Sequence, residues 1–361
     1  MYRKLLIAFS LFVSLFTGHL AQAQLTVTTG LSATDLISAI EGMGITISSP
    51  VLTCDTASEG SFMATGTLLE MTNGIVLTNG KASACSGLEG ALASHTMGTS
   101  GDTDMVLYGT LPPGTATFDA CILEFDFTGE GEVVGVNYQF GAEEYRNAVC
   151  SEYNDAFAIF VSGPGIAGIQ NIAKVPGTTI PVEINSINDG TPGSVGGARL
   201  PNCTDLGPGS PFTSLYIDNA GGTFMTYRGY TKNLRAIQTI VPMETYHMKF
   251  SIVDAGNANY DAGVFIEGLS LDTSSIGPGL YTASLANSLT GFSLYPNPAK
   301  TSIMVSGSKA LEQISICNLI GQVVFVKQNR STKETIDISA LPQGVYFVKV
   351  NNSLVRSFVK E

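Results

Sequence analysis

Short segments in which apolar and polar residues alternate recur along this chain, separated by turns rich in glycine, asparagine or proline. In residues 120–127, Leu123, Phe125 and Phe127 fall on one face and Glu124 on the other. A period of two is typical of a strand with one buried face. The same pattern recurs in residues 133–140, 155–162, 246–253 and 263–271. We therefore predict an all-β fold, a jelly roll or sandwich-like N-terminal module followed by a small immunoglobulin-like β-sandwich.

Only one segment has the spacing of a helix. In residues 32–42, Leu36, Ile37 and Ile40 recur at helical intervals behind a possible cap at Ser32 or Thr34. Residues 163–212 are rich in Gly, Pro, Asn and Ser, which predicts long irregular loops with short strands.

The N-terminus has the pattern of a secretory signal. Arg3 and Lys4 precede an apolar run over residues 5–16, and Ala21-Gln22-Ala23 offers the small residues that a signal peptidase accepts. We expect residues 1–23 to be removed. The apolar run is too short to span a membrane, and no other segment approaches the roughly 20 apolar residues that a span needs, so we expect no transmembrane segment.

The remaining chain divides by composition and charge. We expect a module at residues 24–271, a Ser-, Thr- and Gly-rich linker at 272–291, and a small domain at 292–361. Residues 24–291 hold 8 Lys or Arg and 26 Asp or Glu, a net charge of −18, whereas residues 292–361 carry +4. So acidic a module repels nucleic acid and anionic lipid, and suits divalent cations or a basic partner. The acidic residues could equally serve solubility alone.

Six cysteines follow the signal, and export makes disulfides plausible. The pairing that we predict from their loop-like surroundings is Cys54 with Cys85 and Cys150 with Cys203. Cys121 and Cys317 lie in apolar strand patterns, so we expect them to be packed free thiols. Spacing alone does not settle the connectivity, and no pair has the CxxC spacing of a zinc or redox site.

Two loops are rich in oxygen ligands. Residues 143–155 begin with two glutamates and end in Asn-Asp, and residues 254–261 read Asp-x-x-Asn-x-Asn-x-Asp. Ca²⁺ takes six to eight oxygens, which such loops can supply. The predicted calcium ligands are Glu143, Glu144, Asp155, Asp254 and Asp261. The alternative is that these residues form Asx turns and solvated surface.

The sequence offers few catalytic motifs. Beyond the signal, His95 and His247 are the only histidines, and we see no G-x-S-x-G, HExxH or phosphate-binding loop. We expect His247 to be a half-buried sheet residue. A glycoside hydrolase could use Glu143 with Asp155 or Asp261, although the chain has no Trp to form a sugar platform. We therefore predict a binding or adhesion module for an unknown glycan or protein, with a secreted carbohydrate-active hydrolase as the alternative.

The C-terminal segment carries a series of short motifs, in the order Tyr295-Pro296-Asn297-Pro298, Asn318-Leu319-Ile320-Gly321, Leu341-Pro342-Gln343-Gly344-Val345-Tyr346 and Phe358-Val359-Lys360. Residues 292–361 thereby resemble the type A C-terminal sorting domain of the type IX secretion system of Bacteroidetes. The resemblance implies that the secretion machinery is the partner of residues 292–361. It also implies release or attachment at the outer surface after the domain is removed. The residues that carry the motif are Pro296, Asn297, Pro298, Gly321, Gly344, Tyr346 and Lys360.

The acidic module carries its own motifs, which include Tyr138-Gln139-Phe140-Gly141-Ala142-Glu143-Glu144-Tyr145, Tyr153-Asn154-Asp155-Ala156-Phe157 and Tyr260-Asp261-Ala262-Gly263-Val264. It resembles the choice-of-anchor L domain, a family of exported modules with differing C-terminal anchors. Ala142 and Ala262 depart from the family pattern, where Ser is expected. The resemblance implies a context of export but no defined activity.

Overall fold

The computed structural model describes residues 24–67, 69–272, 292–307, 311, 313–318, 323–328, 331–350 and 354–361. The predicted signal peptide, nearly all of the predicted linker and Gly321 lie outside these residues. No helix in the described part of the chain is long and apolar enough to cross a membrane.

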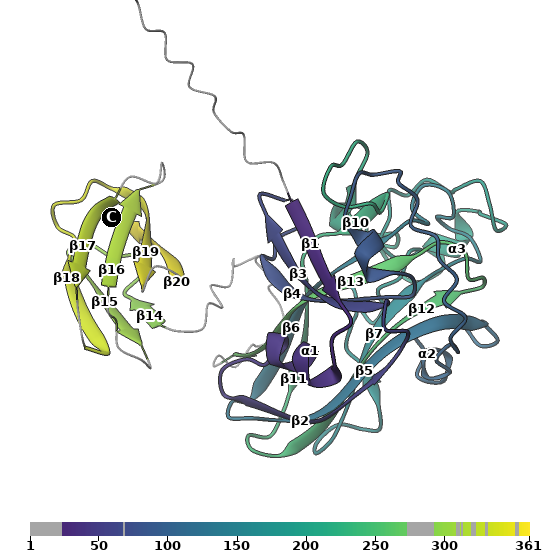
Figure 1. The fold of residues 1–361 in the computed structure, drawn as a ribbon, viewed down its shortest axis with the longest axis horizontal. Coiled ribbons are helices and arrows are strands. Elements are labelled where there is room, and N and C mark those ends of the chain that lie inside the picture. The colour runs from purple at the N-terminus through teal and green to yellow at the C-terminus, as the bar shows by residue number, and fades with distance from the viewer. Residues whose placement is uncertain are drawn as a thin grey trace, which may run out of the picture.

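The all-β prediction is confirmed, since residues 24–272 form two antiparallel sheets (Figure 1). The order of the first sheet is β1 (Gln24–Thr29), β3 (Glu59–Thr65), β4 (Asn73–Thr78), β13 (Ala262–Asp272), β6 (Val133–Ala142), β10 (Gly229–Thr231) and β9 (Tyr216–Asp218), with β11 (Leu234–Thr239) also paired to β6. The order of the second is β2 (Ile45–Thr53), β5 (Thr117–Gly129), β12 (Thr245–Ala255), β7 (Ala156–Ser162) and β8 (Gln170–Asn171).

The alternating residues of the long strands face a shared core. Leu123, Phe125 and Phe127 of β5 are buried there, as the sequence predicts, together with Tyr138 of β6 and Phe250 of β12. Phe250 meets Phe125 edge to face, with ring centroids 5.4 Å apart. Pairs of this kind add to the stability that area burial supplies. The large apolar face of each strand therefore holds the two sheets together.

Helices are short, and α1 and η1 contribute buried side chains to the cores. The predicted helix is α1 (Ala33–Ile40), and Ser32 caps it in a reciprocal capping box with Asp35. The other helical turns are η1 (Ala82–Cys85), α2 (Asp104–Leu107), α3 (Pro201–Thr204) and η2 (Thr213–Leu215). Of these, α3 lies in the loop region that the sequence predicts at residues 163–212, and η2 follows directly after that region.

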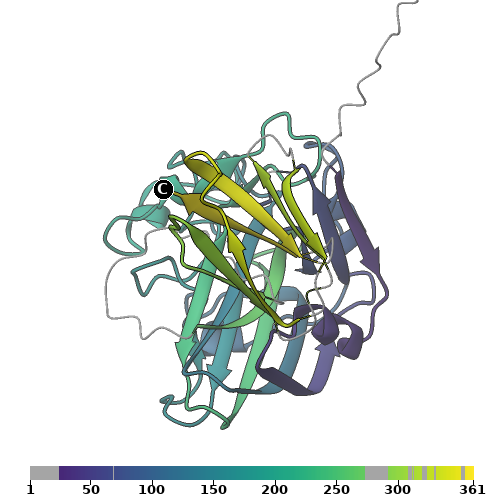
Figure 2. The same ribbon diagram turned by 90° about the vertical axis from the view of Figure 1, so that its left-hand side faces the viewer.

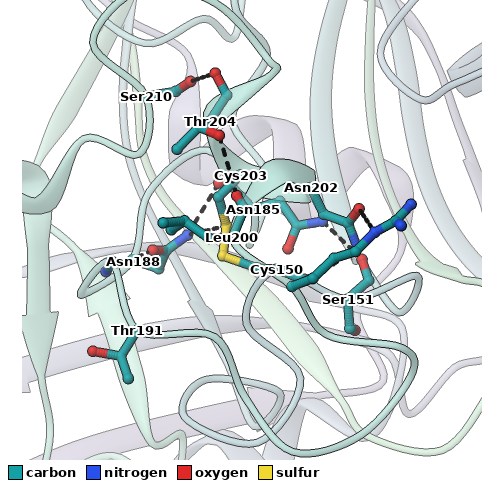
Figure 3. Close-up of a disulfide and its surroundings, with 12 residues drawn as sticks. Cys150, Ser151, Asn185, Asn188, Thr191, Leu200, Asn202, Cys203, Thr204 and Ser210 are labelled. Carbon is teal, nitrogen blue, oxygen red and sulfur yellow. Dashed lines mark hydrogen bonds between the residues drawn. A yellow bond between two sulfur atoms is a disulfide. The ribbon is translucent and has the colours of Figure 1, made fainter.

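Cys150 is bonded to Cys203, with 5.0 Å between their Cα atoms, and this pairing is the one predicted. The bond ties the turn after β6 to α3, and Figure 3 shows asparagine side chains gathered around it. Asn188 Nδ2 donates to the carbonyl of Ile184 at 2.8 Å, and Asn202 Nδ2 donates to the carbonyl of Cys150 at 2.8 Å. The disulfide therefore anchors a loop that has little regular structure of its own.

The predicted bond between Cys54 and Cys85 is wrong, because Cys54 is bonded to Cys121. The pairing of β2 with β5 places Thr53 opposite Ile122, so the next two residues, Cys54 and Cys121, face each other across the strands. Cys121 is therefore not a free thiol. Cys85 is a buried free thiol instead, and the predicted free thiol Cys317 is half-buried.

Residues 292–361 form two small sheets. One has the order β14 (Phe292–Tyr295), β15 (Ser302–Gly307) and β18 (Lys333–Asp337). The other has the order β17 (Val323–Gln328), β16 (Gln313–Asn318), β19 (Gly344–Val350) and β20 (Leu354–Lys360). Ile303, Ile316, Val348 and Phe358 are buried in their common core. Figure 2 shows these strands in yellow-green to yellow.

Candidate functional site

In the first sheet, two of the predicted ligands lie side by side. Strands β6 and β13 run antiparallel with Ala142 opposite Ala262. Glu143 directly follows β6 and Asp261 directly precedes β13, so the two acids meet where the strands end. The backbone N–H of Glu143 donates to the carbonyl of Asp261 at 3.0 Å. The two alanines that depart from the family pattern are both fully buried behind this pair.

The second sheet supplies another pair in the same way. Strands β12 and β7 run antiparallel with Val253 opposite Ala156, so Asp254 and Asp155 come next on the neighbouring strands. The two carboxyl groups lie close enough to shift each other's pKa. Glu144 lies close enough to Asp155 and Asp254 to interact with both electrostatically. The structure thus gathers the five predicted residues into one cluster, and each is at most 2 % exposed.

Asp155 is held in place by neutral donors. Asn79 Nδ2 donates to Asp155 Oδ2 at 2.7 Å, and the backbone N–H of Ala255 donates to Oδ1 at 2.9 Å. Asn79 Oδ1 in turn accepts from the backbone N–H of Ala262 at 2.6 Å. Asn79 therefore links the end of β4 to both acidic loops.

Asp261 is bonded to a histidine. Asp261 Oδ1 accepts from the backbone N–H of His95 at 2.6 Å, and Oδ2 lies 2.7 Å from His95 Nδ1. The neighbouring Thr96 Oγ1 donates to the carbonyl of Ala258 at 2.7 Å. These bonds fasten the loop at 94–96 onto the loop that precedes Asp261. The side chain of His95 remains 29 % exposed.

Glu143 is paired with an arginine at the surface. Arg228 Nε donates to Glu143 Oε1 at 2.8 Å, and the guanidinium lies over the ring of Tyr260, 5.9 Å from its centroid. Arg228 is 21 % exposed, whereas Glu143 is fully buried. The half-exposed Tyr260 and Arg228 thus cover the buried acidic cluster.

Three carboxylate oxygens of the cluster have no hydrogen-bond partner although they are buried: Glu143 Oε2, Glu144 Oε2 and Asp254 Oδ1. Within the described ranges, however, no group of three or more His, Cys, Asp or Glu side chains is arranged to hold a metal ion. The predicted calcium ligands are therefore gathered together, but they do not converge on one point.

The family model of the choice-of-anchor L domain matches residues 25–272. The chain belongs to this family. A second model, the secretion system C-terminal sorting domain, matches residues 293–360. The protein is therefore one that the type IX secretion system delivers to the cell surface or releases.

Other comparisons add little. No protein of curated function matches the chain. PorZ, a surface component of the type IX secretion system of Porphyromonas gingivalis, is 20% identical over 27% of this chain and 15% of its own, with a TM-score of 0.17. A β-1,2-glucanase from Parabacteroides distasonis is 10% identical over 76% of this chain and 35% of its own, with a TM-score of 0.18. The adhesin domain of Epf from Streptococcus pyogenes is 9% identical over 77% of this chain and 91% of its own, with a TM-score of 0.16. Similarity this weak supports no inference about function.

Burial dominates the electrostatics of the choice-of-anchor L domain's cluster. It raises the pKa of Glu144 well above its usual value, and the charges of Asp155 and Asp261 raise it further. Burial also raises the pKa of Asp254, as does the charge of Asp155. For Glu143 burial again raises the pKa, but the charge of Arg228 opposes that shift. The cluster thus carries more acid than its own cations neutralise.

Sequence patterns alone do not point to every residue of this site. Arg228 and Asn79 carry no distinctive motif, and His95 lies in a Ser- and Gly-rich loop without an acid nearby in sequence. Asp261, its partner, is 166 residues away. A backbone hydrogen bond joins the two loops, since the N–H of Asp261 donates to the carbonyl of Ala93 at 3.0 Å. The other histidine, His247, lies in a strand as predicted, but it is 48 % exposed and its Nδ1 lies 3.0 Å from Asp126 Oδ1.

The residues of the sorting motif connect the two ends of their domain. Pro296, Asn297 and Pro298 form an exposed turn after β14, and Asn297 Oδ1 accepts from the backbone N–H of Val359 at 2.9 Å. The next residue of β20, Lys360, is largely buried. The entry segment is therefore hydrogen-bonded to the last strand.

Tyr346 and Gly344 belong to β19. Tyr346 Oη donates to the carbonyl of Pro342 at 2.9 Å, and its ring stacks on Phe358 with the centroids 5.6 Å apart. Gly344 begins the strand and pairs with Lys360. These contacts give the motif a structural role in closing the domain.

Proposed function

We propose that the choice-of-anchor L domain is a surface-displayed binding module that takes a glycan at the end of the sandwich where Arg228, Tyr260 and His95 lie. The main observation in support of glycan binding is the contact between Arg228 and Tyr260. Glu143 holds the guanidinium through Nε, and no described residue accepts a hydrogen bond from its two terminal amino groups. These donors and the half-exposed ring offer what a sugar needs, which is a flat apolar surface beside hydrogen-bond donors.

The surrounding loops support a binding role. They lie on a rigid sandwich with a well-packed core, which is where proteins commonly carry recognition loops. The export signal at residues 293–360 would place this end of the module in contact with extracellular polymers. We further propose that Ca²⁺ stabilises the acidic loops beneath the surface, as the sequence predicts.

A glycan array with the exported protein tests the binding function. Tyr260→Ala should lower the affinity for a retained glycan at least tenfold, because it removes the ring and frees the guanidinium above it. Val241→Ala is a matched control, since Val241 is exposed and precedes β12, whose other end carries Asp254. An array without retained glycans, or equal binding by Tyr260→Ala, would contradict the proposal.

One observation favours the second candidate, a hydrolase. A buried carboxylate that holds one ring nitrogen of a histidine orients the other nitrogen for proton transfer, and Asp261 holds His95 Nδ1 in this way. The paired carboxylates Glu143 and Asp155 or Asp261, however, are all buried away from a substrate. Release of reducing sugar from host or algal polysaccharides, lost in His95→Gln, would establish this activity in place of simple binding.

A further inference from the structure

A buried lysine lies against two aspartates on the face of the second sheet that points away from the main core. Lys249 belongs to β12, Asp102 precedes α2, and Asp104 begins it. Lys249 is 8 % exposed and Asp102 is 6 % exposed. Lys249 Nζ lies 2.7 Å from Asp104 Oδ2, and 3.0 and 2.9 Å from Oδ1 and Oδ2 of Asp102. The nitrogen therefore faces the whole carboxyl group of Asp102 and not one of its oxygens.

A small core of its own surrounds this lysine. Met105 of α2 packs there with apolar side chains of β5, β7 and β12. The ring of Phe160 lies 5.9 Å from Lys249 Nζ, and Tyr108 meets that ring edge-on, with the centroids 5.6 Å apart. An ion pair in such surroundings is costly, because both charges have lost their water. An amide in place of the pair would remove both charges.

The carboxyl group of Asp102 is fixed by two further donors. Ser251 Oγ donates to Asp102 Oδ2 at 2.7 Å, and the backbone N–H of Asp104 donates to Oδ1 at 3.0 Å. Ser251 lies two residues after Lys249 on β12 and is fully buried. Each oxygen of Asp102 thus accepts a hydrogen bond besides the one from the lysine.

The backbone before Asp102 is fixed as well. Ser100 forms a β-bridge with Phe118, and the N–H of Ala120 donates to the carbonyl of Ser100 at 3.0 Å. Gly101 lies so close to β5 that a Cβ at this position would clash with the carbonyl of Thr117. The sheet therefore holds the approach of Asp102 to the lysine from both sides.

We propose that Lys249 and Asp102 are joined by an isopeptide bond that fastens the α2 segment to the sheet. Nζ of Lys249 forms a bond to Cγ of Asp102, and one carboxyl oxygen of Asp102 leaves. An ammonium and a carboxylate together lose one water, so the step needs no oxidant and no other co-reactant. The bond is independent of the glycan binding proposed above.

Asp104 is the proton acceptor for this step. Burial lowers the pKa of Lys249, but the hydrogen bonds and charges of Asp104 and Asp102 outweigh burial and leave this pKa raised. The nitrogen attacks only after it has lost a proton, which Asp104 Oδ2 can take and return to the leaving oxygen. Because the side chain of Asp104 is 32 % exposed, the water that forms can leave to solvent.

The donors on Asp102 support the same step. Negative charge develops on the oxygen of Asp102 that remains when Nζ adds to the carboxyl carbon. Donors that are already in place stabilise such a charge. Ser251 Oγ and the backbone N–H of Asp104 supply them without a change in the structure.

Mass spectrometry of the reduced and unfolded chain, purified with its sorting domain attached, tests the bond. The wild-type mass should be about 18 Da below the value for its sequence, because one water is lost. A proteolytic digest should yield a branched peptide that joins residue 102 to residue 249. Lys327 and Glu334 are an internal control, since this ion pair of 2.6 Å is exposed to water and should give linear peptides only.

Variants assign the residues. Lys249→Met and Asp102→Ala should each restore the full mass, and Asp104→Asn should leave most chains at full mass because the proton acceptor is absent. Glu124→Gln is the matched control, since Glu124 lies opposite Lys249 on β5 and takes no part in the step. This variant should lose the same mass as the wild type.

Three results would overturn the proposal. The first is a wild-type chain at full mass, and this measurement needs no variant to fold. The second is a mass loss without the branched peptide between residues 102 and 249, and the third is a loss that persists in Lys249→Met. Complete bond formation in Asp104→Asn would overturn the role of Asp104.

Discussion

Glu143 and Asp261 lie 118 positions apart in the sequence, and the backbone N–H of one donates to the carbonyl of the other at 3.0 Å. Their side chains nevertheless have different partners, since Glu143 is paired with Arg228 and Asp261 with His95. One backbone contact thus joins two surface pairs above the buried acids, and each pair can be perturbed separately.

Removing Arg228 from its pair with Glu143 should lower the stability of the fold. Arg228→Met leaves the fully buried Glu143 without its partner, and we expect a loss of about 3 kcal/mol in the free energy of unfolding. The double variant with Glu143→Gln should recover most of it, because the unpaired charge is then absent. Urea unfolding of the four proteins in a double-mutant cycle measures the coupling. Additive effects would show that the pair does not contribute as the structure indicates.

The buried Glu183 should make stability depend on pH. Burial raises its pKa from 4.5 to about 8, so between these values the folded protein holds a proton that the unfolded chain has lost. The contribution of Glu183 to the free energy of unfolding is complete below pH 4.5 and is lost as pH rises through about 8. The free energy of unfolding should fall by at most about 1.4 kcal/mol per pH unit because of this group.

The variant Glu183→Gln should remove that part of the slope, since the amide mimics the protonated acid at every pH. Urea unfolding at pH 5 and pH 8.5 measures the difference. Glu124→Gln, at a partly exposed position on β5, serves as the control and should follow the wild type. Identical slopes for wild type and Glu183→Gln would mean that Glu183 titrates normally.

The disulfide between Cys150 and Cys203 should stabilise the long loop region. It closes a loop with a sequence separation of 53, for which chain entropy predicts about 4 kcal/mol. The double variant Cys150→Ala and Cys203→Ala should lose stability of that order in urea unfolding. Peptide mapping under non-reducing conditions should recover this bond and the one between Cys54 and Cys121. A peptide that joins Cys54 to Cys85 would contradict the strand register.

Deletion of residues 292–361 should keep the protein inside the cell envelope, because the sorting domain matches residues 293–360. Immunoblots of culture medium and cell fractions measure the distribution. The milder change Tyr346→Phe removes one hydrogen bond, to Pro342, and should cost this domain about 1 kcal/mol without blocking export. Normal appearance of the deleted protein in the medium would be incompatible with sorting through this segment.

Local patterns were sufficient for much of the fold. Alternation in β5 predicts which of its side chains enter the core, and the Ser32 cap predicts the start of α1, because both depend on neighbours within a few residues. The five acids could also be proposed together, since oxygen-rich residues at strand ends are visible in the sequence. Their role as calcium ligands stays a prediction.

Contacts between distant segments could not be predicted from local sequence patterns. Cys54 meets Cys121 because of the register of β2 on β5, which includes a bulge between Ser48 and Val51. A shift of one residue in that register would point a side chain to the opposite face, and composition does not encode it. His95 acquires its acid only when its loop lies against the loop that precedes β13. The chain's local chemistry therefore specified strands, cap and export signal, whereas packing of strands far apart in sequence selected the partners of each cysteine, histidine and buried acid.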